Sequence, residues 1–178
     1  MLFTGIFCID HHQHSDIKLE NVVLTEQFCA KLVDFGLAFE FPANAPTSYL
    51  GIPTGTHVYL APECWTGLYS TASDMWALGV LLSYLLFLVP PYFDSENERP
   101  CALSVSATPT NRKNNVQLEK LYPFTSLNPV RFKKRHVSSE CKDFMQRLFR
   151  KRSCERLTAE DALKHPWLTK YSNVGLVE

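Results

Sequence analysis

The sequence is organised around the stretch HSDIKLEN at residues 14–21 and the tripeptide DFG at residues 34–36. Between them lie two short apolar runs, VVL at 22–24 and KLV at 31–33, which predict a small β-hairpin. The hairpin would bring the acids, the amide and the lysine of the two stretches together. Carboxylate and amide oxygens are ligands that Mg²⁺ prefers, and a lysine can neutralise phosphate charge. The pattern therefore indicates a site for Mg²⁺ and phosphate, with Gly36 expected to supply backbone freedom at the turn.

The chain after the hairpin is first irregular and then strongly apolar. Residues 34–63 contain several prolines and glycines and predict a long loop, and loops of this length inside domains are usually functional. A helix is expected to begin at Asp74, with Ser73 as its N-cap, and to end before Pro90. Its apolar stretch, residues 75–89, is shorter than the roughly 20 residues that span a membrane. We therefore expect this helix to be buried in the core of the domain.

Two further helices are expected in the last forty or so residues. Apolar residues recur with helical spacing over residues 141–149, and Ser138 or Ser139 can cap that helix. Thr158 and Asp161 resemble a capping box that opens a last, short helix. The predicted fold class is mostly α with small β-hairpins.

The composition excludes several classes of protein. The chain has 178 residues, and its 18 basic and 18 acidic residues balance. This gives no electrostatic footprint for nucleic acid or for an anionic membrane. Its six cysteines include no C-x-x-C pair, which indicates reduced thiols and an intracellular, cytoplasmic protein. The tract His11, His12 and His14 could share a cation, but no cysteine or carboxylate is spaced to complete a metal site.

Five motifs, in the correct order, resemble those of the eukaryotic protein kinase family. They are HSDIKLEN (14–21), KLVDFGLA (31–38), GTHVYLAPE (55–63), DMWALGV (74–80) and RLTA followed by LKHPW (156–167). The resemblance covers residues 14–168 except for 94–129. Its closing motif is most similar to that of the calmodulin-dependent and related Ser/Thr kinases.

The resemblance implies a protein-kinase-like fold, of which this chain holds the large C-terminal lobe only. Residues 1–170 would form this partial kinase domain, with an irregular insert at about 94–129 and a C-terminal tail at 171–178. No Gly-rich loop and no strand lysine precede residues 14–21, which resemble the catalytic loop of the family. We therefore expect a truncated chain in which ATP lacks half of its enclosure.

The resemblance implies catalytic roles for three residues. Asp16 would accept or orient the proton of the substrate hydroxyl, and Lys18 would neutralise charge near the γ-phosphate of ATP. Thr56 would contact both of them and shape the site beside the acceptor residue. Lys18 also favours Ser/Thr over Tyr substrates. Glu20 stands where basic-directed relatives meet a substrate arginine, so a protein substrate with a basic residue near its Ser/Thr acceptor is one expectation.

The resemblance also implies how the cofactors ATP and Mg²⁺ are held. Asn21 and Asp34 would be the ligands of Mg²⁺. Lys18, Asn21, Val23 and Asp34 would together form the part of the nucleotide site that this chain supplies.

Three structural contacts follow from the same resemblance. His14 and Phe35 would stack in the hydrophobic column that reports the active state. Asp74 would hold the backbone of the catalytic loop from below. Glu63 and Arg156 would form a buried ion pair whose disruption leaves an uncompensated charge.

The sequence departs from the family pattern just before the catalytic aspartate. Ser15 replaces the arginine that in relatives pairs with an activation-loop phosphate, which suggests that this mode of activation is weak or missing. His12 and Gln13 stand where relatives place apolar strand residues.

Three hypotheses about function follow from the sequence. The first is a Ser/Thr kinase catalytic region, and the second is a catalytically silent kinase-like lobe that binds a partner protein. The third, an unrelated small-molecule phosphotransferase, is disfavoured by the later motifs. The oligomeric state is left open.

Overall fold

The computed structural model describes residues 12–41, 48–50, 54–88, 90–91 and 137–172. The irregular insert expected at about 94–129 and most of the expected tail lie outside these described residues. In chain order, strands and single turns of 3-10 helix come first, and α-helices follow. This order agrees with the predicted class, mostly α with small hairpins.

The strands form three separate two-stranded antiparallel sheets within the described residues. The sheets pair β1 (His12–Gln13) with β4 (Phe39–Glu40), β2 (Val22–Leu24) with β3 (Ala30–Leu32), and β5 (Ser48–Leu50) with β6 (Leu68–Ser70). The β2–β3 hairpin is the one that the sequence predicts, with Val22 opposite Leu32. It joins the two motifs that the sequence analysis starts from.

The helices and helical turns provide the rest of the framework. The 3-10 turns are η1 (Leu19–Asn21), η2 (His57–Tyr59), η3 (Pro62–Thr66) and η4 (Ser153–Glu155). The α-helices are α1 (Thr71–Phe87), α3 (Ser139–Leu148), α4 (Ala159–Leu163) and α5 (Pro166–Ser172).

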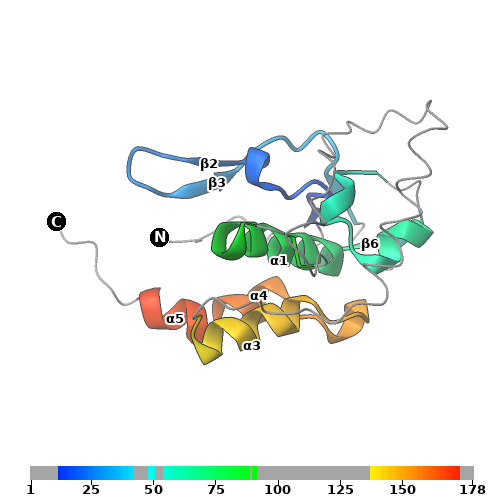
Figure 1. The fold of residues 1–178 in the computed structure, drawn as a ribbon. Helices are drawn as coiled ribbons and strands as arrows, with labels where there is room; N and C mark the ends of the chain where they lie inside the picture. The colour runs from blue at the N-terminus through cyan, green and yellow to red at the C-terminus, as the bar shows by residue number, and fades with distance from the viewer. Residues whose placement is uncertain (1–11, 42–47, 51–53, 89, 92–136, 173–178) are drawn as a thin grey trace.

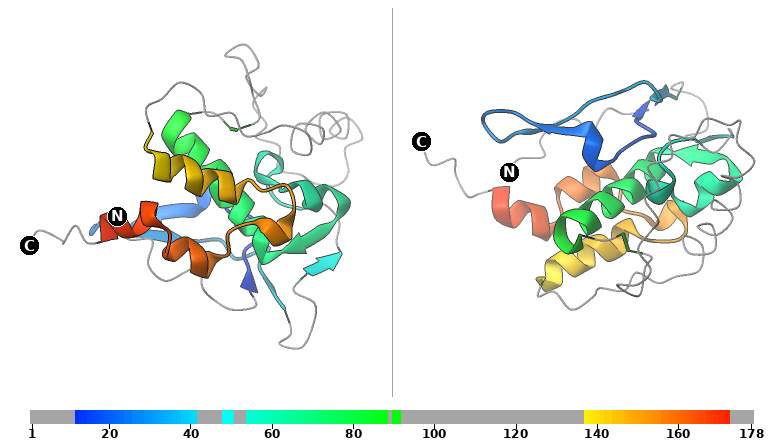
Figure 2. Two further views of the ribbon diagram at one scale, coloured as in Figure 1. Left: turned by 90° about the horizontal axis from the view of Figure 1, so that it is seen from below. Right: turned by 45° about the horizontal axis from the view of Figure 1, so that its top comes forward.

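Helix α1 lies at the centre of the molecule. The β2–β3 hairpin and η1 lie on one side of it, and α3, α4 and α5 lie on the other (Figures 1 and 2). Met75, Trp76 and Val80 are among its buried residues, with at most 4% of each exposed. A helix that is covered on both sides needs apolar residues around most of its circumference, which explains the near-continuous apolar stretch in the sequence.

The predicted start of α1 was wrong by three residues. The helix begins at Thr71, so Ser73 lies in its first turn rather than at its N-cap. Ser73 Oγ accepts the backbone N–H of Ser70 at 3.2 Å and donates to Glu63 Oε1 at 3.1 Å. The hydroxyl of Ser73 therefore accepts the N–H of the N-cap residue, Ser70, from within the first turn of the helix. In the sequence alone, a serine in this role looks like an N-cap. At the other end, Leu88 adopts a left-handed conformation (φ 62°).

No helix in the described part of the chain is long and apolar enough to cross a membrane.

The C-terminal helices begin where the sequence predicts. The hydroxyl of Ser138 accepts the N–H of Cys141 at 3.2 Å, and that of Thr158 accepts the N–H of Asp161 at 3.1 Å. The helix that follows Thr158 is not the last one, however, because α5 begins at Pro166. Proline has no N–H to leave unpaired in a first helical turn, so it starts this additional helix.

The start of α5 is attached to α3 by the side chain of His165. Its Nε2 lies 3.0 Å from Asp143 Oδ2, and its ring packs edge-on against Phe144 at 5.0 Å. Trp167 also packs on Phe144, with ring centroids 5.1 Å apart. The LKHPW motif is therefore a packing motif in this structure.

Gly79 of α1 lies against the C-terminal end of α3. A Cβ atom built on Gly79 would lie 2.9 Å from Cζ of Phe149 and 3.3 Å from Cβ of Leu148. The Phe149 ring cannot retreat freely, because its other face meets Trp76 with ring centroids 5.2 Å apart. Glycine at this position is thus required by helix packing and not by backbone conformation.

The substitution Gly79→Ala tests this close approach. Alanine favours a helix by about 1 kcal/mol over glycine, but overpacking a core costs roughly 1–3 kcal/mol. We expect a net loss of stability, measured as a lower midpoint of thermal unfolding. In a Phe149→Leu background, Gly79→Ala should lower the midpoint by less than it does in the parent. An increase in stability from Gly79→Ala by itself would contradict the packing argument.

Candidate active site

The backbone of the catalytic loop is held by one buried carboxylate. Asp74, in the first turns of α1, accepts the N–H of His14 at 2.6 Å and the N–H of Ser15 at 3.0 Å. Ser15 has a left-handed backbone (φ 69°), which is costly for a residue other than glycine and persists only when its surroundings fix it. Burial raises the pKa of Asp74 to about 7, and the two backbone donors act in the opposite direction. Asp74 is placed as the sequence predicts.

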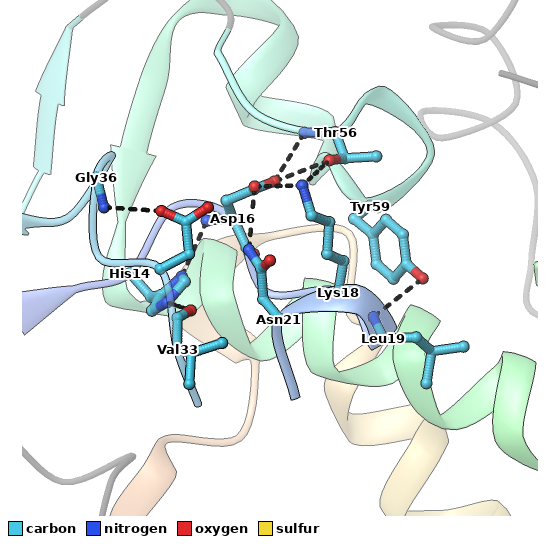
Figure 3. Close-up of polar contacts among 10 residues, drawn as sticks. His14, Asp16, Lys18, Leu19, Asn21, Val33, Gly36, Thr56 and Tyr59 are labelled. Atoms are coloured by element: carbon cyan, nitrogen blue, oxygen red, sulfur yellow. Dashed lines mark hydrogen bonds and ion pairs between the residues drawn. The ribbon is translucent and has the colours of Figure 1, made fainter. Parts of the chain in front are cut away.

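The carboxylate of Asp16 is the centre of the site, and four donors converge on it (Figure 3). Its Oδ1 accepts the hydroxyl of Thr56 at 2.8 Å and the N–H of Thr56 at 3.1 Å. Its Oδ2 accepts Lys18 Nζ at 2.6 Å and Asn21 Nδ2 at 3.2 Å. Lys18 Nζ also donates to Thr56 Oγ1 at 3.1 Å, so these three residues form a closed triangle.

This triangle determines the charge state of Asp16. Burial acts to raise the pKa of Asp16, but hydrogen bonds from Lys18 and Thr56 outweigh it and hold the pKa below its ordinary value. Asp16 is therefore ionised near neutral pH. An ionised carboxylate can accept a hydrogen bond from a hydroxyl and orient it.

The ring of His14 connects the catalytic loop to the DFG strand. Its Nε2 lies 3.1 Å from the carbonyl oxygen of Val33, and its Nδ1 accepts the N–H of Asp16 at 3.3 Å. Because a carbonyl can only accept, these contacts assign the hydrogen to Nε2. Burial lowers the pKa of His14, which favours this neutral form. The ring also meets Phe35 edge-on at 4.8 Å, so the predicted contact between the two is formed.

Asn21 and Asp34 lie at the two ends of the hairpin and differ in what holds them. Asn21 is buried, and its Nδ2 donates to the Asp16 carbonyl at 2.9 Å as well as to the Asp16 carboxylate. This arrangement leaves Asn21 Oδ1 without a donor among the described residues. Asp34 Oδ1 accepts the N–H of Gly36 at 3.3 Å. One oxygen of each side chain therefore remains for a cation.

The donor set at these two residues suits Mg²⁺ only as part of a larger ligand shell. Nowhere in the described ranges do three or more His, Cys, Asp or Glu side chains gather to hold a metal ion. Mg²⁺ is commonly held by one or two protein oxygens together with waters and phosphate oxygens, so the pair fits that mode.

Gly36 does not carry the unusual backbone conformation that the sequence suggested. The residue with the left-handed backbone at this turn is Asp34 (φ 63°), whereas Gly36 is not among the glycines of positive φ. Aspartate tolerates this conformation better than most residues because its short polar side chain can bond to the local backbone. The bond from the Gly36 N–H to the Asp34 carboxylate is of that kind.

A second glycine, Gly55, brings the loop before η2 against the catalytic loop. Gly55 has φ 103°, and a Cβ atom there would lie 2.8 Å from the carbonyl oxygen of Ser15. The same loop is fixed by Tyr69, whose hydroxyl accepts the N–H of Thr54 at 2.6 Å and donates to its carbonyl at 3.1 Å. These contacts position Thr56 beside Asp16. The sequence motif includes Gly55, but no sequence signal links Tyr69 to Thr54.

A buried ion pair joins η3 to the end of η4. Arg156 donates from Nη1 and Nη2 to the two oxygens of Glu63, each at 2.5 Å. The remaining guanidinium N–H groups bond the carbonyl oxygens of Arg150 at 2.8 Å, Ala72 at 3.0 Å and Lys151 at 3.2 Å. All five N–H groups of the guanidinium are therefore satisfied, as a buried arginine requires.

The match to the family model "Protein kinase domain" extends over residues 8–168. This chain belongs to the protein kinase family. The match includes every residue of the arrangement around Asp16, so the kinase-like fold that the sequence implied is supported by both the family and the structure.

Known relatives place the chain near the calcium-regulated kinases. It is 33% identical over 159 residues to calcium-dependent protein kinase 5 of Arabidopsis thaliana, covering 87% of this chain and 25% of the relative. It is 31% identical over 169 residues to calcium/calmodulin-dependent protein kinase type II subunit delta of Oryctolagus cuniculus, covering 91% and 27%. CDPK-related kinase 4 of Arabidopsis thaliana is 31% identical over 177 residues, covering 98% and 26%. The chain thus spans about a quarter of the length of these relatives.

The remaining predicted residues lie at the surface. Val23 is 43% exposed, and Glu20 is exposed beside η1.

Among the cysteines, Cys64 is buried, and burial raises the pKa of its thiol to about 12, which agrees with a packing role. Cys154 is exposed. It occupies η4, a single turn in which no residue is buried.

Removing one partner of the buried ion pair tests its structural role. Arg156→Ala should lower the free energy of unfolding by about 3–5 kcal/mol, because the Glu63 carboxylate stays buried without its partner. The double variant Glu63→Leu with Arg156→Met should be more stable than Arg156→Ala, since no unpaired charge remains. Denaturant unfolding of the variants measures both effects. An unchanged stability of Arg156→Ala would rule out this role.

The pH dependence of thermal stability tests the lowered pKa of Asp16. A folded-state pKa below the ordinary value of 3.8 means that the ionised form stabilises the fold above that pH, and that this contribution is lost as the pH falls through the folded value. Asparagine cannot replace a carboxylate as acceptor for all four donors. The thermal midpoint of the parent should exceed that of Asp16→Asn by a constant margin from about pH 7 to about pH 5, and the margin should close only below about pH 3.8. A margin that closes near pH 5 would contradict the assigned direction.

Proposed function

We propose that this chain is the catalytic region of a Ser/Thr protein kinase that transfers the γ-phosphate of ATP to protein hydroxyls. The observation that supports this most is the arrangement around Asp16. Thr56 donates to one oxygen of the ionised Asp16 carboxylate, and Lys18 donates to the other. The amide of Asn21, which could hold a cation through its oxygen, donates to the same oxygen as Lys18. Phosphoryl transfer depends almost entirely on positioning and on charge stabilisation, and these side chains supply both.

In this proposal Asp16 orients the substrate hydroxyl and accepts its proton. In the structure both of its oxygens are already engaged by two donors each, so one donor must leave before a hydroxyl can bond. Lys18 is the donor that would leave Asp16, because its ammonium group would turn to the γ-phosphate of bound ATP. Thr56 remains in place and keeps the carboxylate oriented.

Asn21 and Asp34 would hold Mg²⁺ through their remaining oxygens, and Val23 would contact the nucleotide. When bound, Mg²⁺ supplies positive charge to the phosphate oxygens of ATP. The exposure of Val23 is compatible with a nucleotide contact, because nothing in the described part of the chain covers it fully.

We further propose that the chain represents the large C-terminal lobe only, as a domain over residues 1–170 with an insert at about 94–129 and a tail at 171–178. Apolar side chains on the hairpin side support this proposal. Leu24 is 55% exposed and Phe35 is 52% exposed. Such surfaces usually have a partner in the complete molecule. An intracellular, cytoplasmic location belongs to the same proposal.

Ser15 determines whether phosphorylation of the activation loop would be needed for kinase activity in this proposal. A serine has no positive charge with which to pair an activation-loop phosphate. The backbone of Ser15 is instead held by Asp74, which needs no phosphate. We expect activity that does not depend on phosphorylation of the loop.

The proposed substrates are proteins with a Ser or Thr acceptor. The exposed carboxylate of Glu20, next to the catalytic loop, would favour substrates with a basic residue near that acceptor. The relatives named as calcium- or calmodulin-dependent kinases support the Ser/Thr class.

The alternative is a kinase-like lobe without catalysis that binds a partner protein. The exposed apolar residues of the hairpin side favour it as much as they favour a missing lobe. The two functions differ in whether the chain binds Mg²⁺ and ATP.

Nucleotide binding separates these two functions. At a ligand concentration ten times the dissociation constant, binding stabilises a protein by about 1.4 kcal/mol, or roughly 3–6 °C for a chain of this size. We expect such a rise in thermal midpoint with millimolar ATP and Mg²⁺, its loss in Asp34→Ala, and its retention in Glu26→Ala, which removes an exposed carboxylate in the hairpin turn. A radiolabelled phosphate assay with serine and tyrosine peptides then tests transfer. The absence of any ATP-dependent shift in the parent chain would favour the silent lobe.

A further inference from the structure

Two of the residues that depart from the family pattern just before Asp16 carry buried polar atoms without a partner in the described part of the chain. Gln13 lies in β1 and is only 1% exposed, yet neither its Oε1 nor its Nε2 has a hydrogen-bond partner among the residues that the structure describes. The hydroxyl of Ser15 is buried and also has no partner in the described part of the chain. Each unpaired buried group of this kind destabilises a fold, so native structures nearly always satisfy such groups with protein or water.

Both residues line the same small cavity beneath the catalytic loop. The cavity has a volume of about 20 Å³. A space of roughly 10–15 Å³ on the same measure is enough to admit one water molecule, provided that several polar groups face it. Gln13 and Ser15 supply an amide oxygen, an amide nitrogen and a hydroxyl.

The other polar side chains around the cavity are already engaged. Thr56 and Asp16 bond each other, and the hydroxyl of Tyr69 bonds the backbone of Thr54. The carboxylate of Asp74 accepts two backbone N–H groups. The unmet hydrogen-bonding capacity at this cavity is therefore concentrated on Gln13 and Ser15.

We infer that this cavity is a binding site for a single buried water molecule, which bridges the side-chain amide of Gln13 and the hydroxyl of Ser15. The water would donate to the amide oxygen, accept from the amide nitrogen and bond the hydroxyl. It thereby joins β1 to the catalytic loop at the residue just before Asp16.

The surroundings select water over an ion. An anion would lie close to the ionised carboxylate of Asp16, which lines the cavity and repels it. A cation would satisfy the oxygens but would leave the amide N–H groups of Gln13 unpaired. Only a molecule that both donates and accepts can satisfy an amide and a hydroxyl together. The inference does not depend on whether the chain transfers phosphate.

A bridging water also explains why the departures from the family pattern at Gln13 and Ser15 occur together. An apolar residue in place of Gln13 would leave the water and the Ser15 hydroxyl with too few partners. A long side chain in place of Ser15 would compete with the water for the cavity. Gln13 and Ser15 therefore act as a matched pair that makes one polar site.

The substitution Gln13→Met distinguishes a hydrated cavity from a dry one by the sign of its effect. Methionine has nearly the same length and no hydrogen-bonding group. If the water is present, the variant loses its bonds, and the thermal midpoint should fall by roughly 3–6 °C. If the cavity is dry, the variant removes an unsatisfied buried amide, and the midpoint should rise. A rise or an unchanged midpoint overturns the inference.

A control and a second measurement complete the test. Gln146→Met makes the same change at an exposed position of α3 and should leave the midpoint unaltered. The double variant Gln13→Met with Ser15→Ala should lose less than the sum of the single losses, because both residues depend on one water; additive effects would contradict a shared water. If Gln13→Met does not fold, a crystal structure of the parent chain decides. Density for a water within about 3.2 Å of both side chains supports the site, and an empty cavity overturns it.

Discussion

The carboxylate of Asp74 accepts two consecutive backbone N–H groups, those of His14 and Ser15, at the point where the catalytic loop passes over the central helix. Other features of the site are positioned relative to this contact. It stabilises the left-handed backbone of Ser15, which sets the direction in which the chain continues to Asp16. Asp16 in turn gathers Lys18, Asn21 and Thr56 around one carboxylate. The loop is thereby anchored to α1, a helix that is covered on both sides.

Much of the site could be predicted from the sequence, because its residues belong to motifs with fixed spacing. The five-residue separation of Asp16 and Asn21 spans one turn of 3-10 helix, so both side chains return to the same point. The β2–β3 hairpin and the caps at Ser138 and Thr158 were also predictable, since each depends on neighbours in sequence.

The features that sequence reasoning missed depend on distant or competing contacts. Ser73 has the composition of an N-cap, but its hydroxyl serves Ser70 and Glu63 from within the helix, and the Glu63 contact is invisible in the local pattern. Gly36 was expected to take the strained conformation that Asp34 adopts. The requirement for Gly79 comes from Phe149, seventy residues later, and no periodicity in the sequence reports it. Helix α5 was overlooked because it has a proline at its first position.

The bond between Glu63 and Arg156 joins parts of the chain that are 93 residues apart. The guanidinium also bonds the backbone at Ala72, just inside α1, and at Arg150 and Lys151, just after α3. The entropy of closing a loop grows only with the logarithm of its length, by about 0.6 kcal/mol for each doubling. Because the start of α1 and the chain just after α3 are fastened at one point, the segment from Ala72 to Arg150 forms a closed loop. Its length can change at little entropic cost. The arginine thus separates the geometry around Asp16 from changes in the length of this loop.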